Sequence, residues 1–167
     1  LEENTVPEIQ RTNLSSVVLL LKSLGINDLI HFDFMDPPPI PTLSASLEHL
    51  YALGALNDRG ELTRLGRRMA ELPLDPMLSK MLLQSEVYKC TTDILSICAM
   101  LSVGGQIHYA PKEKAALAEA ARKSFFHPSG DHLTLLNIFC GWAGSRFDQQ
   151  WCYDNFVQYK SMQRALN

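Results

Sequence analysis

The sequence predicts a mainly α-helical chain, in which a small module of helix, β-hairpin and short helix precedes a helical bundle. Three observations predict this organisation. Apolar residues recur at helical spacing through most of the 167 residues. A turn at residues 57–60, with the sequence Asn-Asp-Arg-Gly, separates two short apolar segments. No run typical of a strand follows residue 110.

The first helix is expected to run from Leu14 to Leu24, with Asn13 as its N-cap and Gly25 just past its end. Phe32 and Phe34 then alternate with polar residues, which indicates a short extended segment. The prolines at 37–39 and 41 form a stiff break, where we place a boundary.

A second helix is expected from Thr42 to Gly54. The segment 55–62 reads as a small hairpin around its turn, and Thr63 caps a short helix stopped by Pro73. Helix, hairpin and short helix in this order are typical of the later part of a winged-helix module. An ordinary helix–hairpin connection is the alternative.

Everything after Leu74 is predicted to be helical. The expected helices begin at Asp75-Pro76; at Thr92-Asp93, ending at Gly104-Gly105; at Lys112, ending at Phe125; at Asp131, which we expect to act as an N-cap; around Trp151; and at Val157, running to Leu166.

The overall charge argues against a protein that binds nucleic acid through bulk positive charge, because 15 Lys and Arg residues face 18 Asp and Glu residues. A local basic groove remains compatible with this sum. The longest apolar run, 17–21, is far too short to span a membrane. The chain starts without Met and stops inside a helical pattern, so we expect a fragment.

No residues are predicted to be catalytic or to bind a metal. The chain has no phosphate-binding loop, nucleophile elbow or zinc-binding helix. Three of its four cysteines, Cys98, Cys140 and Cys152, lie among apolar residues and are expected to be buried free thiols, which suggests a cytosolic or nuclear compartment. Asp131, His132 and His127 are read as a helix cap and loop.

Two stretches are locally basic. One contains Arg59, Arg64, Arg67 and Arg68, and the other contains Lys112, Lys114, Arg122 and Lys123. Each is read as a solvated face, with a surface that follows a phosphate backbone as the alternative. The aromatic residues Trp142, Trp151, Tyr153 and Tyr159 are expected to lie in the core rather than to stack on bases.

Beyond these patterns, the chain resembles the DEAH-box RNA helicases, most closely those that act in pre-mRNA splicing. The likeness lies in LEENTVPEIQRTNL (1–14), FDFMDPP (32–38), LYALGAL (50–56), LTRLGR (62–67), LPLDPM (72–77), GDHL (130–133) and WCYDNF (151–156). It implies the end of a second RecA-like domain and linker at 1–36, a winged helix at 37–73, and a helical-bundle ratchet domain, incomplete at its C-terminus, at 74–167.

The resemblance also implies a function for the parent protein. It would be an ATP-dependent helicase moving along RNA from 3′ to 5′ during splicing in the nucleus. ATP and Mg²⁺ would bind upstream RecA-like domains, so this segment would need no cofactor. The implied partners are single-stranded RNA, spliceosomal proteins and a G-patch activator, with no membrane.

Six residues are predicted to lie near RNA, because a basic helix runs into a glycine-containing turn where bare backbone can approach phosphate. They are Lys112, Arg122, His127, Gly130, Asp131 and Asn155. The alternative function is a protein-docking platform that presents Leu43, Leu47 and Tyr51 to a partner. Helical spacing instead favours those three as the core of the winged helix itself.

Overall fold

The computed structural model describes residues 14–103 and 107–166. The chain divides between Gln84 and Ser85 into two compact units. Each is described by itself. The expected mainly α-helical class is confirmed, whereas the three expected domain ranges remain predictions.

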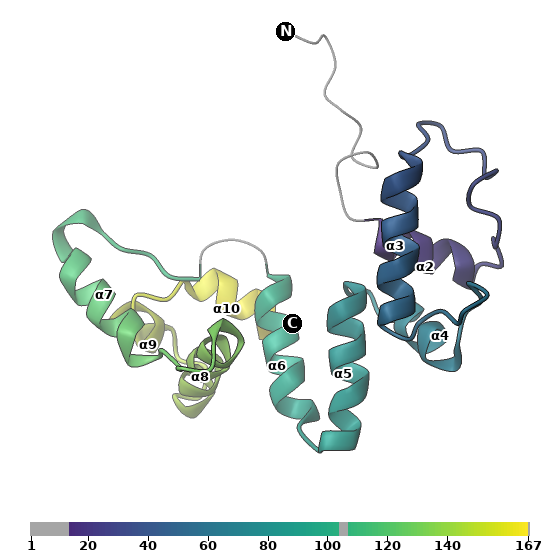
Figure 1. Ribbon diagram of the computed structural model, residues 1–167. Coiled ribbons are helices and arrows are strands. Elements are labelled where there is room, and N and C mark those ends of the chain that lie inside the picture. The colour runs from purple at the N-terminus through teal and green to yellow at the C-terminus, as the bar shows by residue number, and fades with distance from the viewer. Residues whose placement is uncertain (1–13, 104–106, 167) are drawn as a thin grey trace, which may run out of the picture. The chain divides into compact units, whose positions relative to one another are not determined.

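Three helices form the centre of the first unit. These are α2 (Ser15–Ser23), α3 (Ile40–Ala52) and α4 (Arg64–Ala70), and α2 packs against both of the others (Figure 1). Their shared core is apolar and includes Leu14, Val18, Leu19, Leu43, Leu50 and Met69. This packing, rather than helix propensity, holds such short helices together.

Most helix ends follow the expected signals. Gly25 adopts a φ of 90° just after α2, as a C-terminal glycine should. The predicted cap Asn13 lies outside the described residues. Pro41 does not stand before the second helix but inside its first turn. A proline is tolerated there, because the first-turn N–H groups have no intrahelical acceptor.

The prediction of an extended segment at Phe32 and Phe34 is wrong. Residues 30–32 and 35–36 form bends, and the N–H of Phe34 donates to the carbonyl of Phe32 at 2.9 Å. A bond between residues two apart closes a three-residue turn, which an extended strand cannot do. The two rings then pack edge to face with centroids 4.7 Å apart.

The predicted hairpin is reduced to its turn and a single antiparallel bridge between Leu56 and Leu62. The Asn57 side chain accepts from the N–H groups of Arg59 and Glu61, at 3.0 and 2.9 Å, and so forms the turn as expected. Neither arm can lengthen into a strand, because Thr63 already caps α4 by accepting from the N–H of Gly66 at 3.0 Å.

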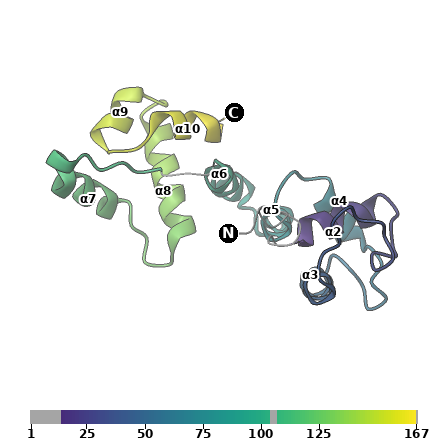
Figure 2. The same ribbon diagram turned by 90° about the horizontal axis from the view of Figure 1, so that it is seen from above.

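Seven helical segments follow: α5 (Pro76–Tyr88), which spans the division between the units, α6 (Thr91–Ser102), the 3₁₀ turn η1 (Lys112–Lys114), α7 (Ala115–Ser124), α8 (Asp131–Gly144), α9 (Gln149–Asp154) and α10 (Tyr159–Leu166). In the second unit α6 packs against α8 and α10, while α9 and α10 lie side by side (Figure 1 and Figure 2). Trp142, Met100, Ile138, Cys152, Val157 and Met162 form the core. The expected stop at Gly104-Gly105 lies outside the described residues.

Candidate nucleic-acid interface

The basic residues of η1 and α7 lie on an exposed surface. Lys112 and Arg122 are exposed, and neither makes an ion pair within residues 14–103 and 107–166. Lys123 differs, since its Nζ lies 3.8 Å from Glu119 Oε1, four residues earlier on the same helix. An exposed pair of this kind contributes at most about 1 kcal/mol. Lys112 and Arg122 are therefore the more available cations.

Arg122 lines a pocket of about 440 Å³, which we call the Arg122 pocket, together with His108, Tyr109 and Glu119. The Nδ1 atom of His108 is buried and has no hydrogen-bond partner among the described residues. Burial lowers the pKa of His108, and the charge of the nearby Arg122 lowers it further. A hydrogen bond to the Phe156 backbone raises this pKa, but not enough to offset the other two effects. The imidazole is therefore neutral at pH 7. Sequence patterns did not single out His108, because a lone histidine carries no motif.

The turn before α8 differs from its prediction at Asp131. Gly130, at a φ of 124°, is the N-cap residue, and Asp131 is the first residue of the helix without a side-chain capping bond. Thr134 Oγ1 closes the turn by accepting from the N–H of His127 at 3.0 Å. The negative charge of the Asp131 carboxylate stabilises the positive N-terminal end of α8, and the same charge repels a phosphate at this position.

The remaining predicted RNA contacts are held by local bonds. His127 Nδ1 accepts from the N–H of Ser129 at 3.1 Å, within the turn. Asn155 lies elsewhere, at the end of α9, where its Nδ2 donates to the carbonyl of Trp151 at 2.8 Å. The structure therefore places Lys112 and Arg122 on one helical segment and His127, Gly130 and Asp131 in one turn. Asn155 belongs to neither group.

A second pocket, the α7–α9 pocket, was missed by sequence reasoning. It has a volume of about 530 Å³, and its lining includes Tyr109, Lys114, Leu117, Gln150, Tyr153, Asp154 and Phe156. Tyr153 was expected in the core, yet half of it is exposed, whereas Trp142 is buried as expected. Helix α9 has only six residues, so helical spacing could not fix which side of it would be covered.

In the first unit, a pocket of about 480 Å³ lies between α3 and the turn at 57–60, and we call it the α3–turn pocket. Tyr51 and Leu47 line it, and Tyr51 is exposed. Leu43 is buried in the core, as helical spacing favours, so it is not available to a partner as the docking alternative requires. Leu47, one turn further along α3, is partly buried and packs against the same core.

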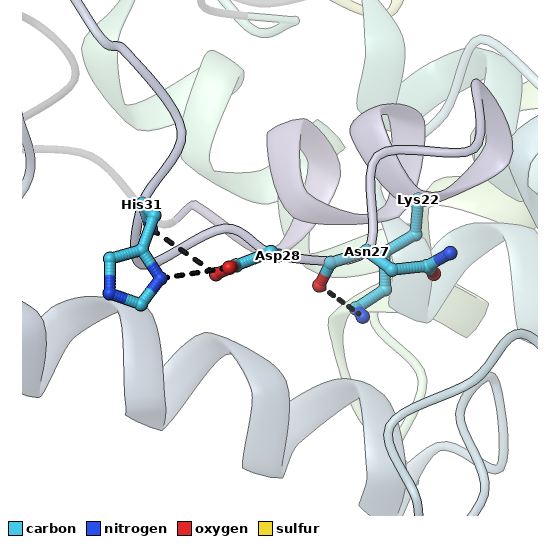
Figure 3. Close-up of polar contacts among 4 residues, drawn as sticks. All are labelled: Lys22, Asn27, Asp28 and His31. Carbon is cyan, nitrogen blue, oxygen red and sulfur yellow. Dashed lines mark hydrogen bonds and ion pairs between the residues drawn. The ribbon is translucent and has the colours of Figure 1, made fainter.

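Lys22 also lines the α3–turn pocket. Only 7% of it is exposed, and its Nζ donates to the carbonyl of Asn27 at 3.4 Å (Figure 3). Burial lowers the pKa of Lys22. Asp28 turns to solvent and accepts from His31 Nδ1 at 2.8 Å, and this bond lowers the pKa of Asp28.

The described residues hold no group of three or more His, Cys, Asp or Glu side chains arranged to bind a metal. Cys98 and Cys152 are buried, and burial raises the pKa of Cys152 to about 11, which keeps it a thiol. Cys140 is exposed, so its predicted burial is wrong. On α8, residue 140 lies on a different side of the helix from the core residues Ile138 and Trp142.

In the described parts of the chain, no helix has the length and apolarity needed to cross a bilayer.

Comparison with known families gives two adjacent matches. Residues 46–74 match the helicase associated domain (HA2), winged-helix, and residues 75–135 match the helicase associated domain (HA2), ratchet-like. The first match contains the second half of α3, the turn and α4, and the second contains α5, α6, η1, α7 and the start of α8. Together the matches run without a gap over more than half of the chain.

Proposed function

From the premise that this chain belongs to the C-terminal helicase-associated region of the DEAH/RHA-type helicases, we propose that it guides single-stranded RNA for an ATP-dependent parent enzyme. The observation that carries the proposal is the exposure of Lys112 in η1 and Arg122 in α7, neither of which forms an ion pair among the described residues, within the ratchet-like match. Guanidinium and ammonium groups bind phosphates without reading the base sequence, as a translocating enzyme requires.

In this proposal the chain performs no bond-making step. ATP and Mg²⁺ bind the RecA-like domains of the parent enzyme, and the closure of these domains moves the RNA strand 3′ to 5′. The ratchet-like unit holds the strand between steps, because a closure advances the RNA only if the strand does not slip back afterwards. We place this activity in the remodelling of RNA–protein complexes during pre-mRNA splicing in the nucleus, on the resemblance of its motifs to splicing helicases.

The charge-neutralising variant Lys112→Ala/Arg122→Ala tests the proposal. Each lost phosphate contact lowers the slope of log affinity against log salt by about 0.7 for a single strand. We therefore expect weaker binding of a labelled single-stranded RNA, by fluorescence anisotropy, and a salt dependence smaller by about two such contacts.

A matched control is Lys160→Ala/Arg164→Ala, which removes the same charge from exposed positions of α10 in the same unit. The control is expected to keep nearly the full salt dependence. Equal losses in both variants would assign binding to net charge alone. An unchanged affinity in the Lys112→Ala/Arg122→Ala variant would remove these residues from the RNA path.

A second candidate function is a docking platform for a G-patch-type activator or a spliceosome component. The α3–turn pocket favours it, since its lining includes the exposed Tyr51 and Leu47, which the unit's own core covers only in part. This function predicts a partner-dependent gain in stability without RNA affinity.

A further inference from the structure

The α7–α9 pocket combines an apolar interior with a polar edge. Its volume of about 530 Å³ lies within the range of small-ligand sites. The rings of Tyr109 and Phe156 meet at a tilt with centroids 5.8 Å apart, and the Tyr109 hydroxyl donates to the carbonyl of Tyr153 at 3.4 Å. These contacts fix one wall of the pocket.

Another part of the pocket lining comes from α7. Leu117 lines the pocket and is 62% exposed, and Tyr153 is 50% exposed on the α9 side. Gln149 Nε2 donates to the Tyr153 hydroxyl at 2.8 Å and holds that side chain in place. An aromatic ring and an aliphatic side chain in the lining of one pocket, both open to solvent, suit a flat ring that stacks on the first and packs against the second.

The polar edge is rich in hydrogen-bond acceptors. Gln150 Nε2 donates to Asp154 Oδ1 at 2.9 Å, which orients both side chains. Gln150 Oε1 and Asp154 Oδ2 are then left to accept from a ligand. Guanine presents two adjacent donors, N1–H and the N2 amino group. The N3–H of uracil is flanked by two carbonyl oxygens, which such acceptors repel.

The rim carries positive charge. Lys114 lines the pocket, and Lys112 lies two residues before it in η1. Both are exposed and neither forms an ion pair within the described ranges. A base in the pocket would place its own phosphate close to this rim.

We propose that the α7–α9 pocket binds one nucleobase of a single-stranded RNA and prefers guanine to uracil. This inference rests on the proposed function, since it assumes that RNA reaches this unit. It adds base selection to a surface whose cations alone would be indifferent to sequence.

The test compares two short labelled RNAs, an oligo-uridine and the same strand with one central guanine, by fluorescence anisotropy with the whole chain. The guanine strand is expected to bind at least about five-fold more tightly, the low end for one well-formed bidentate contact. Asp154→Asn replaces an acceptor at constant shape and is expected to abolish that ratio. Tyr153→Leu is expected to weaken both strands through lost stacking.

Asp93→Asn, in the first turn of α6, is the control for charge. It and Asp154→Asn each remove one negative charge, and the loss of charge by itself raises the affinity for both strands alike. Asp93→Asn is therefore expected to keep the ratio of the two affinities, which Asp154→Asn abolishes. Equal affinity of the wild-type chain for the two strands overturns base selection but leaves RNA guiding intact. A ratio that survives in Asp154→Asn also overturns it. Absence of binding to both strands overturns the proposed function as well.

Discussion

At the scale of single residues, the burial of His108 makes the stability of the folded chain depend on pH. Its pKa is lowered from the ordinary value of 6.5, mainly by burial. Between the folded and unfolded pKa values the unfolded chain binds more protons, so stability falls as the pH drops below 6.5. His108→Phe is expected to remove this acid-dependent loss and to add about 1 kcal/mol at neutral pH, because a buried unsatisfied nitrogen disappears.

Urea denaturation of both proteins at several pH values measures this. The difference in unfolding free energy between His108→Phe and the wild-type chain should widen as the pH falls. A constant difference would mean that His108 titrates alike in the folded and unfolded chains.

Residue identities predicted some local features and not others. Thr63 caps α4 as predicted. The helix expected to begin at Asp75-Pro76 does so, and Asp75 Oδ1 caps it by accepting from the N–H of Met77 at 2.9 Å. A cap needs only one side chain and the next turn, both visible in sequence. Gly130 and Asp131 are both good caps, and only the backbone φ decides between them. The exposure of Tyr153 depends on distant packing, which no local pattern encodes.

At the scale of elements, the approach of α8 to α9 depends on glycine. A Cβ at Gly141 would lie 2.8 Å from Trp151 Cζ2, whereas a Cβ at Gly144, three residues on, would meet nothing within 4 Å. Gly141→Ala is therefore expected to cost about 2 kcal/mol of unfolding free energy through overpacking. Gly144→Ala is expected to be neutral or stabilising by up to about 1 kcal/mol.

The two variants control for each other, because they make the same chemical change in one helix. Urea midpoints at unchanged m-value give the comparison. Equal midpoints would show that Trp151 moves aside at little cost and that the α8–α9 contact is loose.

Element order was predictable and element extent less so. Most helices follow from apolar spacing and end signals such as Gly25 and Gly54, which adopt φ values of 90° and 75°. The hairpin did not form strands, because α3 ends at Ala52 and α4 begins at Arg64, which leaves only four residues before the turn at 57–60 and three after it. Competition between neighbouring elements for the same residues is a tertiary effect that a local pattern cannot show.

At the scale of the whole chain, the net charge of −3 opposes the binding of a polyanion only if the charge is spread evenly. The segment of η1 and α7 carries four cations, Lys112, Lys114, Arg122 and Lys123, against the two acidic residues Glu113 and Glu119, so it is locally positive. Local potential, not the sum, governs the first contact with a phosphate backbone. Of the six residues predicted to lie near RNA, Lys112 and Arg122 on this segment therefore remain the best supported.

The most direct measurement is the affinity of this chain for a short single-stranded RNA and for a matched duplex, by fluorescence anisotropy at about 50 and about 200 mM salt. The account predicts tighter binding of the single strand, weakened at the higher salt. No binding of the single strand at the lower salt would contradict it, and the docking function of the α3–turn pocket would then be the better explanation.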